Sequence, residues 1–146
     1  MTKVIVQGKV KGTVLKTTNP INFLGAIDKK TGIIHDQKID IFEKSIKDSI
    51  LVFPHGIGSS VGAYTIYSLK SYESAPLAMI CKKADLTVAS GCALANIPMI
   101  VVSKQKFDSI ENGEEVEINT ESTTILNSFC VPVLVILLEP VGSALT

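Results

Sequence analysis

Two adjacent serine hydroxyls lie near the middle of this 146-residue chain, directly after a short stretch that contains two glycines. The serines are Ser59 and Ser60, and the glycines before them are Gly56 and Gly58. Glycine permits left-handed backbone angles and lets a ligand approach the main chain closely. The pattern predicts a loop that binds a small anion beside the two hydroxyls. The same residues also suit a simpler role, in which Ser59 only caps a helix and the glycines only shape a turn.

The two histidines, His35 and His55, are the other candidates for acid–base chemistry. An unperturbed imidazole titrates near neutral pH, so either side chain could transfer a proton. A single histidine in a turn is more often an ordinary surface residue. His55 is the better candidate because it lies in the glycine-containing stretch, but we do not assign a catalytic role to either histidine.

The three cysteines, Cys81, Cys92 and Cys130, are an odd number at wide spacing, without a CxxC pair. That spacing does not match a disulfide framework or a zinc site, so we expect no metal bound by this chain. Each cysteine lies in an apolar run, which favours a buried structural thiol. Reduced thiols and a first segment that resembles a strand more than a signal peptide predict a cytoplasmic protein.

The segments on either side of the serines indicate how the loop is held. Residues 50–53 are apolar and β-branched or aromatic, which is typical of a buried strand, and Pro54 ends that strand. Residues 61–70 predict a helix. One face of this helix would contain Val61, Tyr64, Thr65 and Ser68. The first turn of a helix has unpaired N–H groups and a partial positive charge, so an anionic substrate would dock there.

Strands and helices alternate over residues 50–102, which favours a parallel or mixed α/β sheet. Residues 75–81 and 97–102 predict two further buried strands, and residues 91–95 a short helix that ends near Asn96. A single compact domain is expected, because 46% of the chain is hydrophobic and a chain of this length can bury a real core.

The two ends of the chain have a different character. Residues 3–10 predict a strand followed by a bend at Gly12, so the N-terminal part looks all-β. Residues 111–119 predict a hairpin arm, because a turn is followed by alternating side chains. The apolar run at residues 129–138 is too short for a membrane span of ~20 residues and contains a proline. It could be a last strand, an interface segment or a loose tail.

The charge balance narrows the class of partner. Fourteen basic residues offset fourteen acidic ones, so no net field favours nucleic acid or an anionic membrane surface. We therefore expect neither nucleic acid nor a membrane as a partner.

Five motifs together resemble the small subunit of the aconitase X family, and most of all its archaeal phosphomevalonate dehydratase branch. The likeness runs from about residue 4 to residue 119, and the order and spacing of the motifs make it more specific than the serine loop alone. The motifs are NPINFLG at residues 19–25, Asp28 with Thr31 and Gly32, PHGIGSS at residues 54–60, APLA at residues 75–78, and Ala84-Asp85 with Gly91-Cys92-Ala93 and Ile97-Pro98-Met99.

This resemblance implies an α/β fold, a swivelling β/β/α domain similar to the C-terminal swivel domain of aconitase. It would cover residues 1–122, leaving residues 123–146 as an apolar C-terminal extension. The resemblance also implies a large partner subunit that carries a [4Fe–4S] cluster, with no cluster on this chain. The implied activity is a hydro-lyase that removes water from mevalonate 5-phosphate, in an archaeal-type isoprenoid pathway.

The same resemblance assigns roles to the loop. Ser59 matches the serine that removes a proton from carbon, and Ser60, Gly56 and Gly58 match residues that bind the substrate. Ile57 departs from the pattern, because many relatives carry Arg or Lys there. Two alternatives therefore stay open. One is a dehydratase for hydroxyproline or another small hydroxyacid, and the other is a non-catalytic module that binds an anion or a partner.

Overall fold

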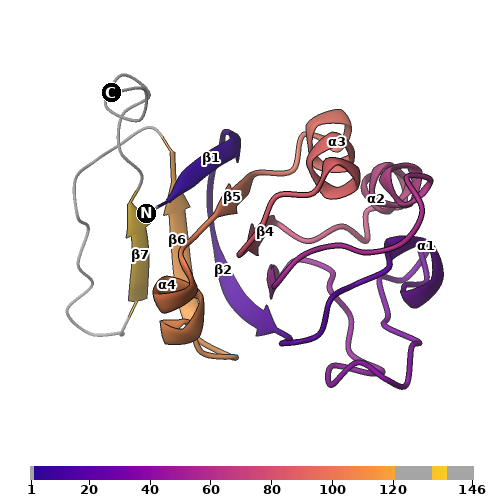
Figure 1. Ribbon diagram of the computed structural model, residues 1–146, viewed down its shortest axis with the longest axis horizontal. Helices are drawn as coiled ribbons and strands as arrows, with labels where there is room; N and C mark the ends of the chain where they lie inside the picture. Colours follow the sequence, from indigo (N-terminus) through magenta and orange to yellow (C-terminus); the bar gives the residue numbers. More distant parts are fainter. Residues whose placement is uncertain (1, 121–132, 138–146) are drawn as a thin grey trace.

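The computed structural model describes residues 2–120 and 133–137, which form one curled mixed sheet flanked by helices (Figure 1). The sheet has seven strands in the order β1-β5-β4-β3-β2-β6-β7. The strands are β1 (Lys3–Val6), β2 (Lys9–Lys16), β3 (Ile50–Phe53), β4 (Ala78–Cys81), β5 (Met99–Val101), β6 (Glu115–Asn119) and β7 (Val133–Leu137). The helices are α1 (Phe23–Ala26), α2 (Gly62–Ser71), α3 (Leu86–Ala95) and α4 (Lys104–Ser109).

Four strands in the middle of the sheet, β2, β3, β4 and β5, run parallel to one another. Every residue of β3 and β4 is buried, which explains why both strands have continuous apolar sequences instead of an alternating pattern. The predicted buried strand at residues 50–53 and the predicted parallel or mixed sheet are therefore confirmed. Parallel strands end at the same edge, so the segments that follow these four strands lie along one edge of the molecule.

The middle strands separate two apolar cores. On one face, α1, α2 and α3 pack against side chains such as Leu51, Phe53 and Met79. On the other face, Val116 and Ile118 of β6 and Phe107 of α4 pack against the remaining side chains of β3, β4 and β5. The curl of the sheet therefore places β6 over the central strands as a second β layer (Figure 1). This is the predicted β/β/α architecture.

Helix α2 confirms the predicted helix, with a shift of one residue at each end. The face that carries Val61, Tyr64, Thr65 and Ser68 is mostly not the buried face of the helix. The side chains of Ala63, Ile66 and Leu69 are buried against the sheet and α3. Val61 is 47% exposed and Tyr64 is 68% exposed. The prediction was misleading because apolar residues occur around most of this helix, so spacing alone does not reveal which side faces the core.

Two local predictions in the terminal parts are wrong, and one short helix was not predicted. Gly12 lies inside the continuous strand β2 and not at a bend, because β6 pairs beside it and a side chain there would meet Leu77 at 2.8 Å. Residues 115–119 do not form a local hairpin arm, since β6 pairs antiparallel with the distant strand β2. Helix α4 was not predicted, and Ser103 caps its first turn.

Helix α3 is longer than predicted. It begins at Leu86 after its cap residue Asp85 and ends, as predicted, at Asn96, which adopts a left-handed conformation.

Ile33 and Ile34 form isolated bridges and not a strand.

The predicted C-terminal extension falls mostly outside the described residues, and so does Cys130. Of residues 123–146, the structure describes only β7, which runs parallel to β6. No helix within the described ranges is long and apolar enough to cross a membrane.

Candidate functional site

The serine loop, residues 54–61, leaves the carboxyl end of β3 and leads into α2. Ligands of parallel α/β sheets bind at this edge, because the loops that follow neighbouring strands converge there. The starts of α1 and α3 contact the same loop, through their cap residues Asn22 and Asp85. The serine loop is therefore held between the starts of three helices.

Asp85 fixes the first part of the serine loop. One oxygen of its carboxylate accepts a hydrogen bond from the Gly56 N–H at 2.9 Å, and the other accepts one from the Val88 N–H at 3.2 Å, in the first turn of α3. A side chain at Gly56 would meet Val88 Cγ2 at 2.6 Å and the Asp85 carboxylate at about 3.0 Å. Position 56 thus requires glycine because α3 approaches the loop so closely.

Asn22 lies against the second glycine in the same way. Its side chain caps α1 by accepting from the Leu24 N–H at 3.2 Å. Gly58 has a φ of +92°, a left-handed conformation, and a side chain there would meet the Asn22 amide at 2.6 Å. The glycine loop also pairs with the preceding segment, because the Ile57 N–H donates to the Ile21 carbonyl at 2.9 Å. The loop is therefore bonded into the body of the domain.

Ser59 and Ser60 are both exposed at the tip of this loop. The Ser59 hydroxyl oxygen accepts a hydrogen bond from the Val61 N–H at 3.1 Å, so the predicted capping role is present locally, although α2 begins only at Gly62. An N–H group directed at the serine oxygen would also stabilise negative charge on that oxygen. Within the described residues, the Ser59 hydroxyl donates no hydrogen bond. It is free to interact with a ligand.

Within the described residues, neither histidine forms a hydrogen bond with Ser59 or Ser60. The carbonyl of His55 accepts from the Ile21 N–H at 3.2 Å, which anchors the backbone of the loop. The His35 ring lies 2.9 Å from the Gly25 carbonyl, at the end of α1. The geometry thus gives His55 a structural backbone role, and His35 lies at the opposite end of α1 from Asn22.

The described cysteines do not fit a metal or cluster site. Cys81 and Cys92 are fully buried free thiols. Burial, and to a lesser extent the charge of Asp85, raises the pKa of Cys92 to about 12. Burial likewise raises the pKa of Cys81 well above 9.0, with smaller contributions from Cys92 and Asp85. A cluster ligand must reach the iron, and neither of these thiols is accessible from the surface, so they are unsuited to that role. Within the described residues, no group of three candidate ligands comes together.

A cavity of about 600 Å³ lies at the opposite edge of the sheet from the serines. It is lined by the residues before β2 and β4 and by the ends of α2 and α3, including Gly8, Glu73, Pro76 and Asn96. The serine loop contributes no residue to this cavity. The serines instead lie on an open surface, which is what half of a shared site would present.

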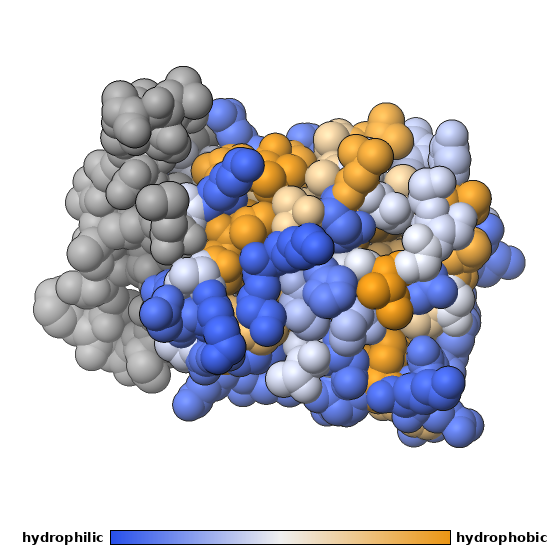
Figure 2. All heavy atoms as spheres, in the orientation of Figure 1, coloured by the Kyte–Doolittle hydropathy of each residue, from blue (hydrophilic) through white to orange (hydrophobic). Residues whose placement is uncertain are grey.

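Large apolar side chains surround the serine loop and are exposed. The exposed fraction is 50% for Leu24, 50% for Ile57, 47% for Val61 and 81% for Leu86, and these residues lie at the starts of the three helices or in the loop itself. Figure 2 shows apolar patches at the surface on the side of the molecule where these helices lie. Apolar side chains around a polar centre are typical of a surface that another protein covers. We call these four residues the apolar rim.

The β/β/α layers, with the exposed serine loop at their carboxyl edge, define a swivel-type domain. A family model described as the aconitase X swivel domain matches residues 1–127. The chain therefore belongs to the aconitase X family, as its swivel domain, and the predicted fold and family are confirmed.

Curated relatives and a solved structure agree with this assignment. The phosphomevalonate dehydratase small subunit of Thermococcus sibiricus is 43% identical over 117 residues, covering 80% of this chain and 88% of that protein. The protein of the same name from Methanosarcina acetivorans is 40% identical over 118 residues, covering 80% and 82%. The crystal structure of Thermococcus kodakaraensis aconitase X in its holo form superposes with a TM-score of 0.77 at 40% identity, covering 80% of this chain and 88% of that one.

Sequence reasoning identified the loop but not the residues that hold it. Asn22 and Asp85 both belong to the motifs that carry the family resemblance, yet no role was assigned to them. Their signal was available in part, because asparagine and aspartate are good helix caps, although no helix was predicted directly after either residue.

The buried thiols predict a pH dependence of stability. Unfolded cysteines ionise near pH 9, whereas the folded Cys92 keeps its proton up to about pH 12. Ionisation of this thiol therefore leaves the free energy of unfolding unchanged below pH 9. Between pH 9 and about pH 12, it lowers the free energy of unfolding by about 1.4 kcal/mol per pH unit. Urea unfolding between about pH 9 and pH 11 should show a shallower decline for Cys92→Ala than for the wild type. Equal slopes would mean that the thiol ionises in the folded chain.

Proposed function

We propose that this chain is the small subunit of a hydro-lyase that removes water from mevalonate 5-phosphate, and that Ser59 accepts the proton taken from carbon. The observation that carries the proposal is the exposed serine, held by a rigid glycine loop at the carboxyl edge of a swivel domain. The names of the relatives, phosphomevalonate dehydratase small subunit, support the substrate and the division into subunits. The reaction belongs to an archaeal-type mevalonate pathway in the cytoplasm.

The loop provides part of what a serine base needs. A serine alkoxide is quenched by water, so it requires a closed site and nearby dipoles that stabilise its charge. The Val61 N–H already donates to the Ser59 oxygen, and the start of α2 adds a partial positive charge. Closure is not supplied by the described part of the chain, because Ser59 and Ser60 are exposed there. Ser60, Gly56 and Gly58 would contact the substrate beside Ser59.

The chemistry removes a proton from one carbon and a hydroxyl group from its neighbour, so that water leaves and a double bond forms. Ser59, as an alkoxide, takes the proton and becomes a neutral hydroxyl, while the hydroxyl group of the substrate leaves as hydroxide. Transfer of the serine proton to that hydroxide completes the water and restores the alkoxide. Departure of the hydroxyl group needs a second group, which the described residues of this chain do not offer. The [4Fe–4S] cluster that the family resemblance implies would be carried by the large subunit, since Cys81 and Cys92 are fully buried and no three candidate ligands come together in the described residues.

The apolar rim supports a large subunit as the body that closes the site. Leu24, Ile57, Val61 and Leu86 surround the serines without being buried in this chain. Covering them would remove apolar surface from water, at about 25 cal/mol per Å², and would exclude water from Ser59 at the same time. Assembly and activation of the serine would therefore be one event.

A second candidate keeps the fold and changes the substrate to hydroxyproline or another small hydroxyacid. Ile57, half exposed between the two glycines, favours it, because an apolar side chain there offers no charge to a phosphate. A non-catalytic binding module is the remaining alternative. Assays of the assembled complex with mevalonate 5-phosphate and with hydroxyproline separate the two dehydratases, and turnover of neither favours the module.

Substitution of the proposed base tests its role. In the complex reconstituted anaerobically with its large subunit, Ser59→Ala should lower kcat for loss of water by about 10³-fold, the usual contribution of a positioned base. Ser71→Ala is the matched control, because Ser71 is an exposed serine at the far end of α2. It should leave kcat unchanged. An active Ser59→Ala complex that assembles normally would exclude Ser59 as the base.

Substitution in the apolar rim tests the docking face. Leu86→Glu should weaken binding of the large subunit at least about tenfold, because a charge would be buried at the interface. Acidic residues are tolerated in the first turn of a helix, so the chain should stay folded. Leu94→Glu is the control on the same helix, because Leu94 is 60% exposed and lies two turns further along. Equal binding by both variants, measured by calorimetry, would place the interface elsewhere.

A further inference from the structure

The serine loop contains no cation, although the proposed substrate carries both a phosphate and a carboxylate group. Ile57 occupies the position between the glycines, and residues 54–61 contain no lysine or arginine. A phosphate monoester bound in a closed site needs positive charge or several hydrogen-bond donors. We therefore expect that charge on the neighbouring segments of the carboxyl edge.

Two consecutive lysines follow β4 and are attached to the start of the serine loop. The backbone N–H groups of Lys82 and Lys83 both donate to the carbonyl of Pro54, at 3.0 Å and 3.2 Å. Two residues later, the Asp85 carboxylate accepts from the Gly56 N–H at 2.9 Å. The segment with the lysines thus runs along the first residues of the serine loop, at an edge where ligands of parallel sheets bind.

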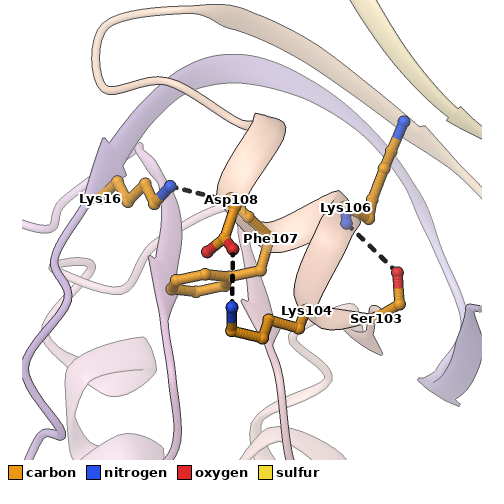
Figure 3. Close-up of polar contacts among 6 residues, drawn as sticks. All are labelled: Lys16, Ser103, Lys104, Lys106, Phe107 and Asp108. Atoms are coloured by element: carbon orange, nitrogen blue, oxygen red, sulfur yellow. Dashed lines mark hydrogen bonds and ion pairs between the residues drawn. The ribbon is translucent and has the colours of Figure 1, made fainter.

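The charges of these two lysines are not neutralised within the described part of the chain. The one ion pair found there joins Lys104 to Asp108 within α4, at 3.5 Å (Figure 3). The closest carboxylate in sequence, Asp85, already accepts two backbone hydrogen bonds. Both lysine side chains are exposed, so water solvates them while the chain is alone.

Two ammonium groups, those of Lys16 and Lys82, lie over the ring of Phe107 at the same edge. The ammonium group of Lys82 lies 4.9 Å from the centre of this ring, and that of Lys16 lies 4.7 Å from it. Lys16 also donates to the carbonyls of Phe107 and Ile110, at 2.8 Å and 2.7 Å, so its donors are used at the end of α4 (Figure 3). Within the described residues the ammonium group of Lys82 contacts this ring and forms no hydrogen bond or ion pair, so its hydrogen-bond donors remain available to a ligand.

We propose that Lys82 and Lys83 form the cationic side of the substrate site and bind the phosphate group of the substrate. The inference rests on the proposed function, because it assumes that the large subunit covers this edge. Once covered, two unpaired ammonium groups would lose their water at a large cost unless an anion replaced it. The substrate phosphate supplies that anion, while Ser59 faces the carbon that loses its proton. Both lysines are substrate-binding residues in this account, and Ile57 needs no charge.

The test compares two pairs of neighbouring lysines that carry the same charge. The variant Lys82→Met with Lys83→Met keeps apolar side chains against Phe107 and removes both charges. The control is Lys29→Met with Lys30→Met, an exposed pair in the turn beside the C-terminal end of α2, where the Lys29 carbonyl accepts from Ser74. Each variant is assembled with the large subunit, and the affinity for mevalonate 5-phosphate is measured by calorimetry, separately from kcat.

The Lys82 and Lys83 variant should bind mevalonate 5-phosphate at least about tenfold more weakly, with kcat at saturating substrate changed less than about threefold. The control pair should bind it like the wild type. Equal affinities of the two variants would overturn the inference. So would a selective loss of large-subunit binding with unchanged substrate affinity, since the lysines would then pair with the partner. A wild-type complex that binds mevalonate 5-phosphate without turnover would refute the proposed reaction, while the calorimetry would still decide the role of the lysines.

Discussion

The carboxylate of Asp85 is the contact on which the site depends. It accepts the Gly56 N–H from the serine loop and the Val88 N–H from α3, so one side chain fixes the loop to the start of a helix. The close approach of α3 then excludes any side chain at position 56, and Asn22 excludes one at Gly58. A loop held in this way can expose two serines without becoming mobile. Rigidity at the base of the loop and exposure at its tip have the same cause.

The layers of the fold explain why apolar side chains remain exposed around the serine loop. Every residue of β3 and β4 is buried, on one face against α1, α2 and α3 and on the other against β6 and α4, so the described part of the chain forms its own core. The apolar rim is left over at the carboxyl edge, where no element of the described chain covers it. The chain therefore folds as one body and yet presents an unfinished surface, as expected for a subunit whose site is completed by another protein.

Much of this arrangement could be predicted from the sequence because its signals are local. The apolar run at residues 50–53, the proline after it and the glycines before Ser59 identified the strand and loop, and the family motifs identified the layers. The remaining features depend on contacts between distant residues. Asp85 reaches Gly56 across 29 positions, and β6 pairs with β2 across more than 100, which no local pattern encodes. Helix α4 was missed because a short polar helix has no apolar period. The face of α2 was misjudged because apolar residues occur around most of it.

The central claim is that the serine loop is an open half of a site that a large subunit closes. Amide hydrogen exchange tests it most directly, because residues 58–61 are all exposed while the chain is alone. Exchange at these residues should slow at least about tenfold when the large subunit is added, while the turn at residues 29–32 keeps its rate. If the large subunit binds and protects other surfaces but leaves residues 58–61 exchanging as before, the loop is not part of a shared site and the account is wrong.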